Sequence, residues 1–212
     1  MASPARTDES ESESEAAGQI SRAAARLFAR RGFEATSTRE IVEEAGLAKP
    51  TLYYHFGSKE GLAKALLVEP LSALVERLGE IVAEESDPAR ALGRVLAAHF
   101  DYCRDDPDRS RFFFAAAFGP PEGPTGSLMA CRKEDLRGPT DAALRRCVEA
   151  GLVPEDEFDA FDSMFRGMLT ISVIDFLYHD KPLGEDRAGM LVATLLRAFE
   201  GRADDAGRDG RA

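Results

Sequence analysis

TREIVEEAGLAKPTLYYHF, residues 38–56, contains two short helical patterns that meet at a glycine. The first begins after Ser37, whose hydroxyl can accept the Glu40 amide hydrogen while the Glu40 carboxylate accepts the Ser37 amide hydrogen, a capping box. Gly46 stands where the chain leaves that helix, a position that favours positive φ. Pro50 suits the first turn of the second helix, where its missing N–H costs nothing. Two short helices joined by a tight glycine turn predict a helix-turn-helix motif.

The second of these helices carries an unusual exposed face. At 100° per residue, Leu52 and Phe56 share one side and are predicted to pack inward. The other side presents hydroxyl, phenol and imidazole groups, which can reach base edges in a DNA groove while lysines at the rim meet phosphates. The residues expected to face DNA are Thr38, Arg39, Lys49, Pro50, Thr51, Tyr53, Tyr54, His55 and Lys59, with a phosphate held by Lys59. The alternative is a plain packing unit in which the two tyrosines are half-buried.

A wider pattern at fixed spacing surrounds this motif within Gln19–Leu67. Its residues are Ile20, Ala23, Ala24, Leu27, Phe28, Gly32, Phe33, Thr36, Ile41, Ala45, Gly46, Leu47, Lys49–Phe56 and Ser58–Leu62. The pattern resembles the N-terminal domain of the TetR family of bacterial transcriptional regulators, and it covers about a quarter of the chain. The resemblance implies a three-helix DNA-binding head, followed by C-terminal helices that form an effector pocket and a dimer-forming bundle. No motif after Val68 identifies which residues line such a pocket.

The distribution of charge supports a DNA-binding head within an acidic chain. The 212 residues carry a net charge of −11, which at first argues against a nucleic-acid partner. Gln19–Leu67 nevertheless holds eight basic and five acidic residues, so this segment carries +3 and the other residues carry −14. Local charge decides where a phosphate backbone can bind, and here the positive segment coincides with the motif.

The chain divides by composition into four segments. Residues 1–15 are rich in Ser and Glu without an apolar anchor and are predicted to be disordered. This acidic segment could compete with DNA for the head, although an inert tail is the simpler interpretation. Residues 16–68 form the DNA-binding domain, with the helix-turn-helix at about 37–56. Residues 69–201 form the C-terminal helical domain for effector binding and dimerisation, and 202–212 a second disordered tail.

Helical periodicity continues through the chain without strand alternation, so the predicted fold class is all-α. The first helix is expected over about 15–31 and the fourth over about 58–84. Pro70 falls inside the fourth helix, where a proline removes one hydrogen bond and clashes with the preceding turn, so a kink or break is predicted there. Gly138-Pro139 predicts a second break within a helical segment at about 127–150.

Polar side chains on the apolar stripes of later helices suggest a small-molecule site. A few polar groups in an otherwise apolar cavity are typical of ligand pockets, and the effector is expected to be largely apolar. The residues expected to line the pocket are His99, Cys103, Phe113, Phe165, Met168, Ser172 and Asp175. The alternative is that these polar groups are satisfied by neighbouring backbone or water.

Metal, cofactor and catalytic chemistry are not expected. A metal site needs three or four convergent ligands, whereas the chain has three histidines, one of which belongs to the motif. The sequence contains no nucleophile elbow, Walker loop, dinucleotide fingerprint or HExxH, so no enzyme is predicted. The chain has an odd number of cysteines, Cys103, Cys131 and Cys147, and none has CxxC spacing. This predicts reduced, mostly buried thiols.

The predicted function is ligand-controlled transcriptional regulation in the cytoplasm, most simply repression at an operator. The sequence contains no run of 18 apolar residues, so no membrane span is predicted. Its acidic N-terminal segment does not resemble a secretory signal. A homodimer is expected through the last two helices, whose apolar residues include Phe161, Phe165, Phe176, Leu191, Leu195 and Phe199. The alternatives are a DNA-binding regulator without a small-molecule effector, and a helical enzyme or interaction module with a vestigial head.

Overall fold

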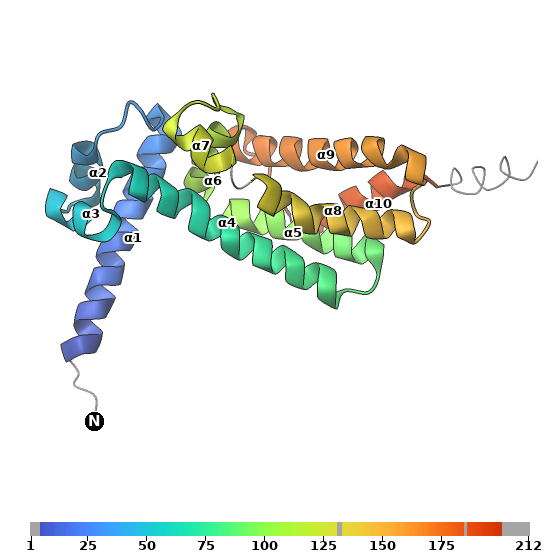
Figure 1. Cartoon of the computed structure of the whole chain (residues 1–212), viewed down its shortest axis with the longest axis horizontal. Coiled ribbons are helices and arrows are strands. Elements are labelled where there is room, and N and C mark those ends of the chain that lie inside the picture. The colour runs from blue at the N-terminus through green and yellow to red at the C-terminus, as the bar shows by residue number, and fades with distance from the viewer. Residues whose placement is uncertain (1–4, 131–132, 185, 201–212) are drawn as a thin grey trace, which may run out of the picture. The chain divides into compact units, whose positions relative to one another are not determined.

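The computed structural model describes residues 5–130, 133–184 and 186–200, and every regular element in these ranges is a helix (Figure 1). The chain divides into two compact units. The first unit comprises 1–70 with 107–132, and the second comprises 71–106 with 133–212. No helix among the described residues combines the length and hydropathy that a membrane span requires.

The first unit is built around α1. Its helices are α1 (Ala5–Arg31), α2 (Thr38–Ala45), α3 (Lys49–Phe56), the first part of α4 (Lys59–Glu84), α6 (Pro107–Phe118) and α7 (Pro124–Ala130). Helices α2, α3 and α6 all pack against α1. The Phe28 ring lies 5.3 Å from the Phe33 ring and 4.8 Å from the Phe112 ring, so an aromatic cluster joins α1 to α6. The sequence placed α6 and α7 in the C-terminal domain, whereas this packing groups them with the N-terminal helices; the functional domain limits stay a prediction.

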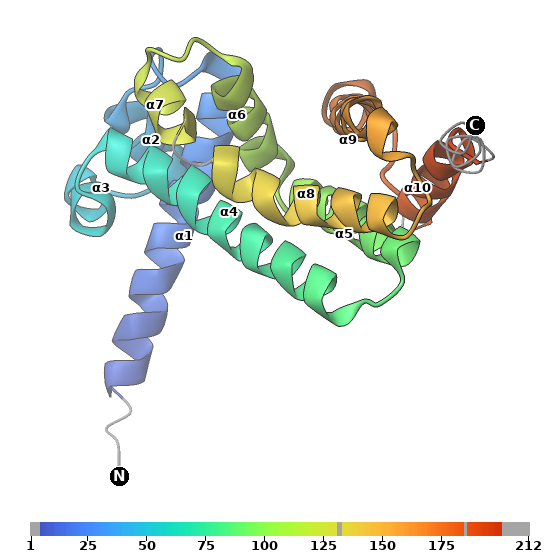
Figure 2. The ribbon, with the colours of Figure 1, turned by 45° about the vertical axis from the view of Figure 1, so that its right-hand side comes forward.

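The second unit is built around α5. Its helices are the rest of α4, α5 (Pro88–Asp105), α8 (Lys133–Glu149), the short 3₁₀ helix η1 (Glu155–Glu157), α9 (Phe158–His179) and α10 (Arg187–Arg197). Helix α5 packs against α8, α9 and α10 (Figure 2). A side chain built on Gly93 would place its Cβ atom 3.8 Å from the Gly189 Cα atom, so α5 and α10 approach closely. Leu92, Val95 and Phe161 are fully buried in this core or nearly so.

Four of the six residues expected at a dimer interface instead fill the core of the second unit. Phe161 and Phe165 are fully buried, and Leu195 and Phe199 are more than nine-tenths buried. The Phe161 and Phe199 rings meet edge to face at 5.5 Å, which joins α9 to the segment after α10. The wide apolar arcs of these helices are therefore used largely within the chain.

Helix α1 begins at Ala5, about ten residues before its predicted start, so residues 5–15 are not the disordered segment expected from composition. Glutamate is a good helix former, and acidic residues near a helix N-terminus interact favourably with the helix dipole. Extending an existing helix also costs little compared with nucleating one. The tail predicted at 202–212 lies outside the described residues.

Neither proline breaks its helix, and a kink at Pro70 stays a prediction. Helix α4 runs without interruption through Pro70, and α8 runs through Pro139. A proline costs one helical hydrogen bond, and burial of residues on both sides of it, such as Leu67 and Leu71 around Pro70, outweighs that cost. Pro70 is nevertheless the last residue of α4 that belongs to the first unit.

Two of the three cysteines behave as the sequence predicted. Cys103 and Cys147 are buried and free of disulfide bonds. Burial also raises the pKa of the Cys147 thiol to about 12, so this sulfur stays protonated at neutral pH. Cys131 lies outside the described residues.

Candidate nucleic-acid interface

The turn between α2 and α3 forms as the sequence predicted. The Ser37 hydroxyl accepts the Glu40 amide hydrogen at 3.2 Å, and the Glu40 carboxylate accepts the Ser37 amide hydrogen at 2.8 Å. Gly46 ends α2 with φ +68°, and the Leu47 amide then donates to the Val42 carbonyl at 2.9 Å. A left-handed residue at this position is what allows the chain to reverse between two short helices.

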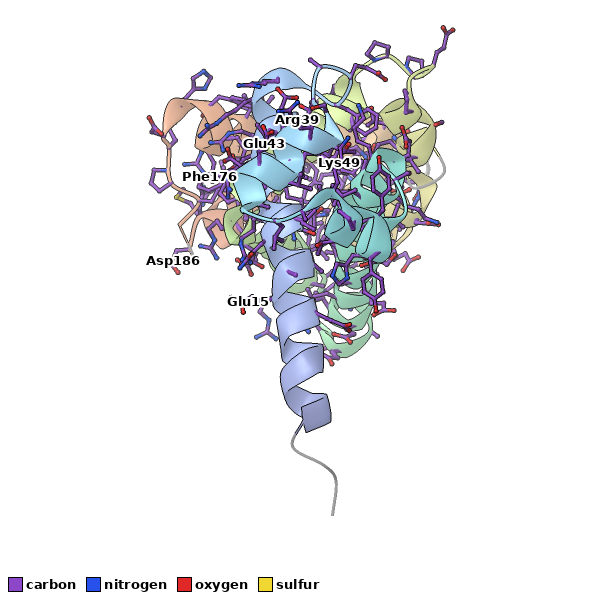
Figure 3. All side chains as sticks on the ribbon, turned by 90° about the vertical axis from the view of Figure 1, so that its left-hand side faces the viewer. Glu15, Arg39, Glu43, Lys49, Phe176 and Asp186 are labelled. Atoms are coloured by element: carbon purple, nitrogen blue, oxygen red, sulfur yellow. The ribbon has the colours of Figure 1, made fainter. Side chains whose placement is uncertain are left out.

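Helix α3 buries one side and exposes the other. Leu52 is fully buried and Phe56 is half-buried, whereas Tyr53 and Tyr54 are 48% and 72% exposed. Lys49, labelled in Figure 3 at the start of α3, is exposed as well. The helix therefore buries Leu52 and exposes Tyr54 as predicted, whereas Tyr53 is close to half-buried. Contact between these side chains and DNA stays a prediction.

Ion pairs hold α2 in place beside α1. The Arg31 guanidinium lies 2.8 Å from the Glu40 carboxylate. The Arg26 guanidinium lies 3.2 Å from the Glu44 carboxylate. Hydrogen bonds from the Ser37 backbone and hydroxyl lower the pKa of Glu40, with a further contribution from Arg31. Among the predicted DNA contacts, Arg39 is paired with Glu43 at 2.7 Å on the outer face of α2 (Figure 3).

Lys59 has a structural role that the sequence did not predict. Its ammonium donates to the carbonyl oxygens of Phe33 and Thr36, at 2.9 and 3.0 Å. The same nitrogen lies 4.2 Å from the centre of the Phe33 ring, within cation–π range. Two of its three N–H donors are thus committed to the loop between α1 and α2. The phosphate contact predicted for Lys59 stays a prediction, with one donor left to make it.

Glu13 contacts the exposed face of α3. The Tyr54 hydroxyl donates a hydrogen bond to the Glu13 carboxylate at 3.2 Å. Glu13 belongs to the part of α1 that was predicted to be disordered, so the sequence analysis missed this contact. Five acidic residues, Asp8, Glu9, Glu11, Glu13 and Glu15, occupy this half of α1.

The residues predicted to bind a ligand lie on three helices in two units. His99 and Cys103 are on α5, and four others, Phe165, Met168, Ser172 and Asp175, are on α9, which packs against α5. Phe113 belongs to α6 in the first unit. Six of the seven predicted residues therefore share the second unit, and their contact with a ligand stays a prediction.

His99 is a partly buried, neutral ring at the contact of α5 with α8. Its Nε2 atom lies 3.4 Å from the Thr140 hydroxyl of α8. Burial lowers the pKa of His99 to about 4, and the positive charge of Arg166 adds to this effect. A neutral imidazole can donate one hydrogen bond and accept another, which suits a polar group inside an apolar cavity.

Asp175 is engaged by the loop that follows α9. Its carboxylate accepts a hydrogen bond from the Lys181 ammonium at 2.9 Å and lies 3.3 Å from Nδ1 of His179. The hydrogen bond from Lys181 is the main cause of a lowered pKa for Asp175, and His179 contributes. This carboxylate therefore stabilises the end of α9 in the described structure. Among the described residues, no three His, Cys, Asp or Glu side chains converge as a metal site requires.

A crevice of about 450 Å³ lies between the first half of α5 and α10. Small residues of the two helices, including Gly93 and Gly189, line it together with charged side chains such as those of Arg90 and Arg94. None of the residues predicted to bind a ligand lines this crevice. The crevice forms where two glycine-containing helix faces approach each other. It could not be predicted from the sequence, because it depends on which helices pack together.

Comparison with known protein families gives a match at the N-terminal end. The profile described as "Bacterial regulatory proteins, tetR family" matches residues 20–66. The transcriptional activator FasR of Mycolicibacterium smegmatis is 34% identical over 97 residues, which cover 46% of this chain and 44% of FasR. The repressor KstR2 of Mycobacterium tuberculosis is 37% identical over 84 residues, which cover 40% of this chain and 42% of KstR2. The chain thus aligns with less than half the length of these curated relatives.

Solved structures match over most of the chain. The TetR family transcriptional regulator PfmR of Thermus thermophilus is 30% identical, with a TM-score of 0.67, over 84% of this chain and 94% of PfmR. The ketosteroid transcriptional regulator KstR2 of Mycobacterium tuberculosis is 26% identical, with a TM-score of 0.73, over 86% of this chain and 94% of KstR2. The likeness to these two regulators therefore extends through both units.

Proposed function

Since this chain belongs to the TetR family of transcriptional regulators, we propose that it binds operator DNA through α3 and leaves the operator when a small molecule binds its second unit. Repression by occluding a promoter is the proposed outcome of operator binding. Binding to chromosomal DNA would place this protein in the cytoplasm. The proposal contains no catalytic step, and the relatives described above are regulators by name.

The observation that carries this proposal is the two-sided character of α3. Leu52 anchors the helix in the core, while Tyr53 and Tyr54 are 48% and 72% exposed and present large aromatic surfaces to solvent. Phenol and hydroxyl groups offer donors and acceptors to base edges, and Lys49 offers a charge to phosphate. These side chains lie on the segment whose charge is +3 in a chain whose net charge is −11.

A homodimer is part of the proposal, because a family of this kind reads two half-sites one DNA turn apart. An exposed apolar stripe on α9 supports it: Met164, Ile171 and Tyr178 recur every seven residues and are 47%, 58% and 54% exposed. Met190 on α10 is 61% exposed. A repeat of seven residues keeps side chains on one face of a helix, as a helix-to-helix contact requires.

The proposed effector is a largely apolar small molecule bound in the second unit. One relative is described as a ketosteroid transcriptional regulator, and this unit combines an apolar core with the partly buried, neutral ring of His99 and the buried hydroxyl of Ser172. Ketosteroids are therefore the first compounds to test. Release of bound DNA by one of them would support this part of the proposal, and a panel with no effect on DNA binding or on melting temperature would favour a regulator without a small effector.

Selection of genomic DNA fragments tests the DNA-binding proposal. The full chain is incubated with sheared genomic DNA of its source organism, and the retained fragments are sequenced. We expect enrichment of an inverted repeat with half-sites one helical turn, about 34–36 Å, apart. Tyr54→Ala should lose this enrichment, whereas Phe118→Ala, which removes an aromatic ring that is 71% exposed outside the motif, should keep it. If the protein retains DNA fragments but no sequence is enriched among them, the proposal is refuted.

A further inference from the structure

We propose that the acidic half of α1, residues 8–15, is an autoinhibitory segment that competes with DNA for the recognition face of α3. This inference rests on the proposed function, because it concerns DNA binding by α3. It goes further in assigning a role to a segment that lies before the residues matched by the family profile, which begin at residue 20.

The hydrogen bond between Tyr54 and Glu13 is the first observation. It joins residues 41 positions apart, and its partners are the exposed tip of the recognition helix and an exposed carboxylate. A hydroxyl has a single hydrogen to donate, so Tyr54 cannot donate to Glu13 and to a base or phosphate at the same time. DNA that uses this donor must first displace Glu13.

The placement of charge is the second observation. Helix α1 extends beyond α3 at its N-terminal end, and Figures 1 and 3 show no other helix of the first unit beside that end. Five carboxylates and one basic residue, Arg6, occupy residues 5–15, so this stretch carries −4 next to a segment that carries +3. A stretch with this negative charge repels DNA phosphates that approach α3.

The position of Gly18 allows the acidic segment to move. Gly18 lies inside α1, between the acidic half and the buried half that begins at Ile20. Glycine weakens a helix because it gains conformational freedom when the helix opens. Glu13 and Glu15, which precede it, are exposed, so opening of this part of the helix costs much less than unfolding of the unit. DNA can therefore displace the segment without disrupting the head.

Charge-neutral variants of the full chain test this role. The arm variant is Glu11→Gln, Glu13→Gln and Glu15→Gln together. The matched control is Glu76→Gln, Glu149→Gln and Glu200→Gln, which changes net charge equally at three positions on α4, on α8 and after α10. Affinity is measured by fluorescence anisotropy for a duplex of about 30 base pairs, roughly three helical turns, of scrambled sequence.

The arm variant should bind this duplex roughly three- to tenfold more tightly than the control at low salt, since each exposed charge pair is worth about 1.5- to 5-fold. The difference should shrink as salt rises, because screening shortens from about 10 Å at 0.1 M to about 3 Å at 1 M. Among single variants, Glu13→Gln should act more strongly than Glu15→Gln, since the Glu15 carboxylate lies 3.5 Å from the Gln19 amide nitrogen instead. Circular dichroism checks that the variants keep their helix content.

Two results would overturn the inference. One is an arm variant that binds the duplex as the parent does, and the other is an equal gain in the control, which would show an effect of total charge alone. A parent chain that retains no enriched genomic sequence would refute the proposed function instead. The two failures are distinct, because the first is judged on scrambled DNA and the second on selected DNA.

Discussion

The ammonium nitrogen of Lys59 lies 2.9 Å from the Phe33 carbonyl oxygen and 4.2 Å from the centre of the Phe33 ring. One side chain at the start of α4 thus holds both the backbone and the ring of a residue in the loop that follows α1. The Phe33 ring in turn packs on Phe28. The position of the recognition motif depends on this contact, because α2 begins five residues after Phe33.

Lys59→Met should destabilise the first unit by about 1–3 kcal/mol, because two carbonyl oxygens lose their donor in a partly buried site. Methionine keeps most of the apolar stem, so the loss reports the ammonium. The measurement is the free energy of unfolding in urea. Lys64→Met, at an exposed position of the same helix, is the control and should stay within about 0.5 kcal/mol of the parent. Equal effects of the two variants would contradict the structural role of Lys59.

Leu52→Ala and Tyr54→Ala should separate folding from DNA binding. Leu52 is fully buried, so its truncation should cost about 2–5 kcal/mol of stability. Tyr54→Ala should leave the melting temperature nearly unchanged and cost roughly 1–3 kcal/mol in binding to a selected operator. Urea unfolding and anisotropy on the same samples provide the comparison. A Tyr54 variant that loses stability and binding together would show that this side chain supports the core.

Pro70→Ala should alter operator affinity, or its response to an effector, without changing the sequence that α3 selects. The substitution restores the hydrogen bond that proline cannot donate and removes the clash with the preceding turn. Because α4 changes compact unit at this residue, a stiffer helix should bias the arrangement of the two units that an effector also biases. Operator titrations with and without effector measure the change. Parent-like behaviour in both would mean that Pro70 only fits the helix to its core.

Acidification should destabilise the second unit through His99. The folded chain holds the pKa of His99 at about 4, below the ordinary value of 6.5, so between pH 6.5 and 4 the unfolded chain binds a proton that the folded chain does not. Stability therefore falls as pH drops through this window, by up to about 3 kcal/mol, and this group causes no further loss below it. Urea unfolding at several pH values should show a shallower fall for His99→Gln.

His179→Gln is the control for that experiment. His179 carries its ring on the surface at the end of α9, with 60% of its side chain exposed. Its replacement should leave the fall in stability between pH 6.5 and 4 as steep as in the parent. If the fall in stability between pH 6.5 and 4 is unchanged in His99→Gln, carboxylates elsewhere in the chain cause it.

Ile171→Glu should convert the proposed dimer to a monomer. Ile171 is 58% exposed at the middle of the apolar stripe on α9, and a buried unpaired charge in a two-fold interface is strongly unfavourable because it occurs twice. Light scattering at micromolar concentration gives the mass. Leu152→Glu, an exposed apolar position outside α9 and α10, should leave the mass unchanged. A parent that is already monomeric would remove dimerisation from the proposal.

Local rules were sufficient to predict the recognition motif. The capping box at Ser37 and the positive φ of Gly46 involve residues within four positions of each other, and the burial of Leu52 follows from helical periodicity alone. Such features depend little on the rest of the fold. The start of α5 follows the same kind of local rule, since the Asp87 side chain accepts the Arg90 amide hydrogen.

Features that depend on distant partners could not be predicted in this way. The role of Lys59 requires carbonyl groups that lie 23 and 26 positions earlier, and their positions are known only once the loop after α1 lies against the start of α4. Composition alone also misjudged the first helix, because the Ser/Glu segment has no apolar anchor but is continuous with a stable helix. The aromatic residues of α9 were assigned to a dimer interface because periodicity shows which faces are apolar, and not which neighbour covers them.

The packing of Phe112 on Phe28 has a consequence for exchanging parts between regulators. The first unit is discontinuous, since the chain leaves it after Pro70 and returns at Pro107. A fragment that stops at residue 70 would expose the Phe28 surface that α6 covers, and a hybrid that joins this segment to a foreign C-terminal half would inherit whatever residue the donor places opposite Phe28. The proposed DNA-binding part of this protein is therefore not a self-contained segment, and a functional transplant has to carry the residues of α6 that face α1 along with it.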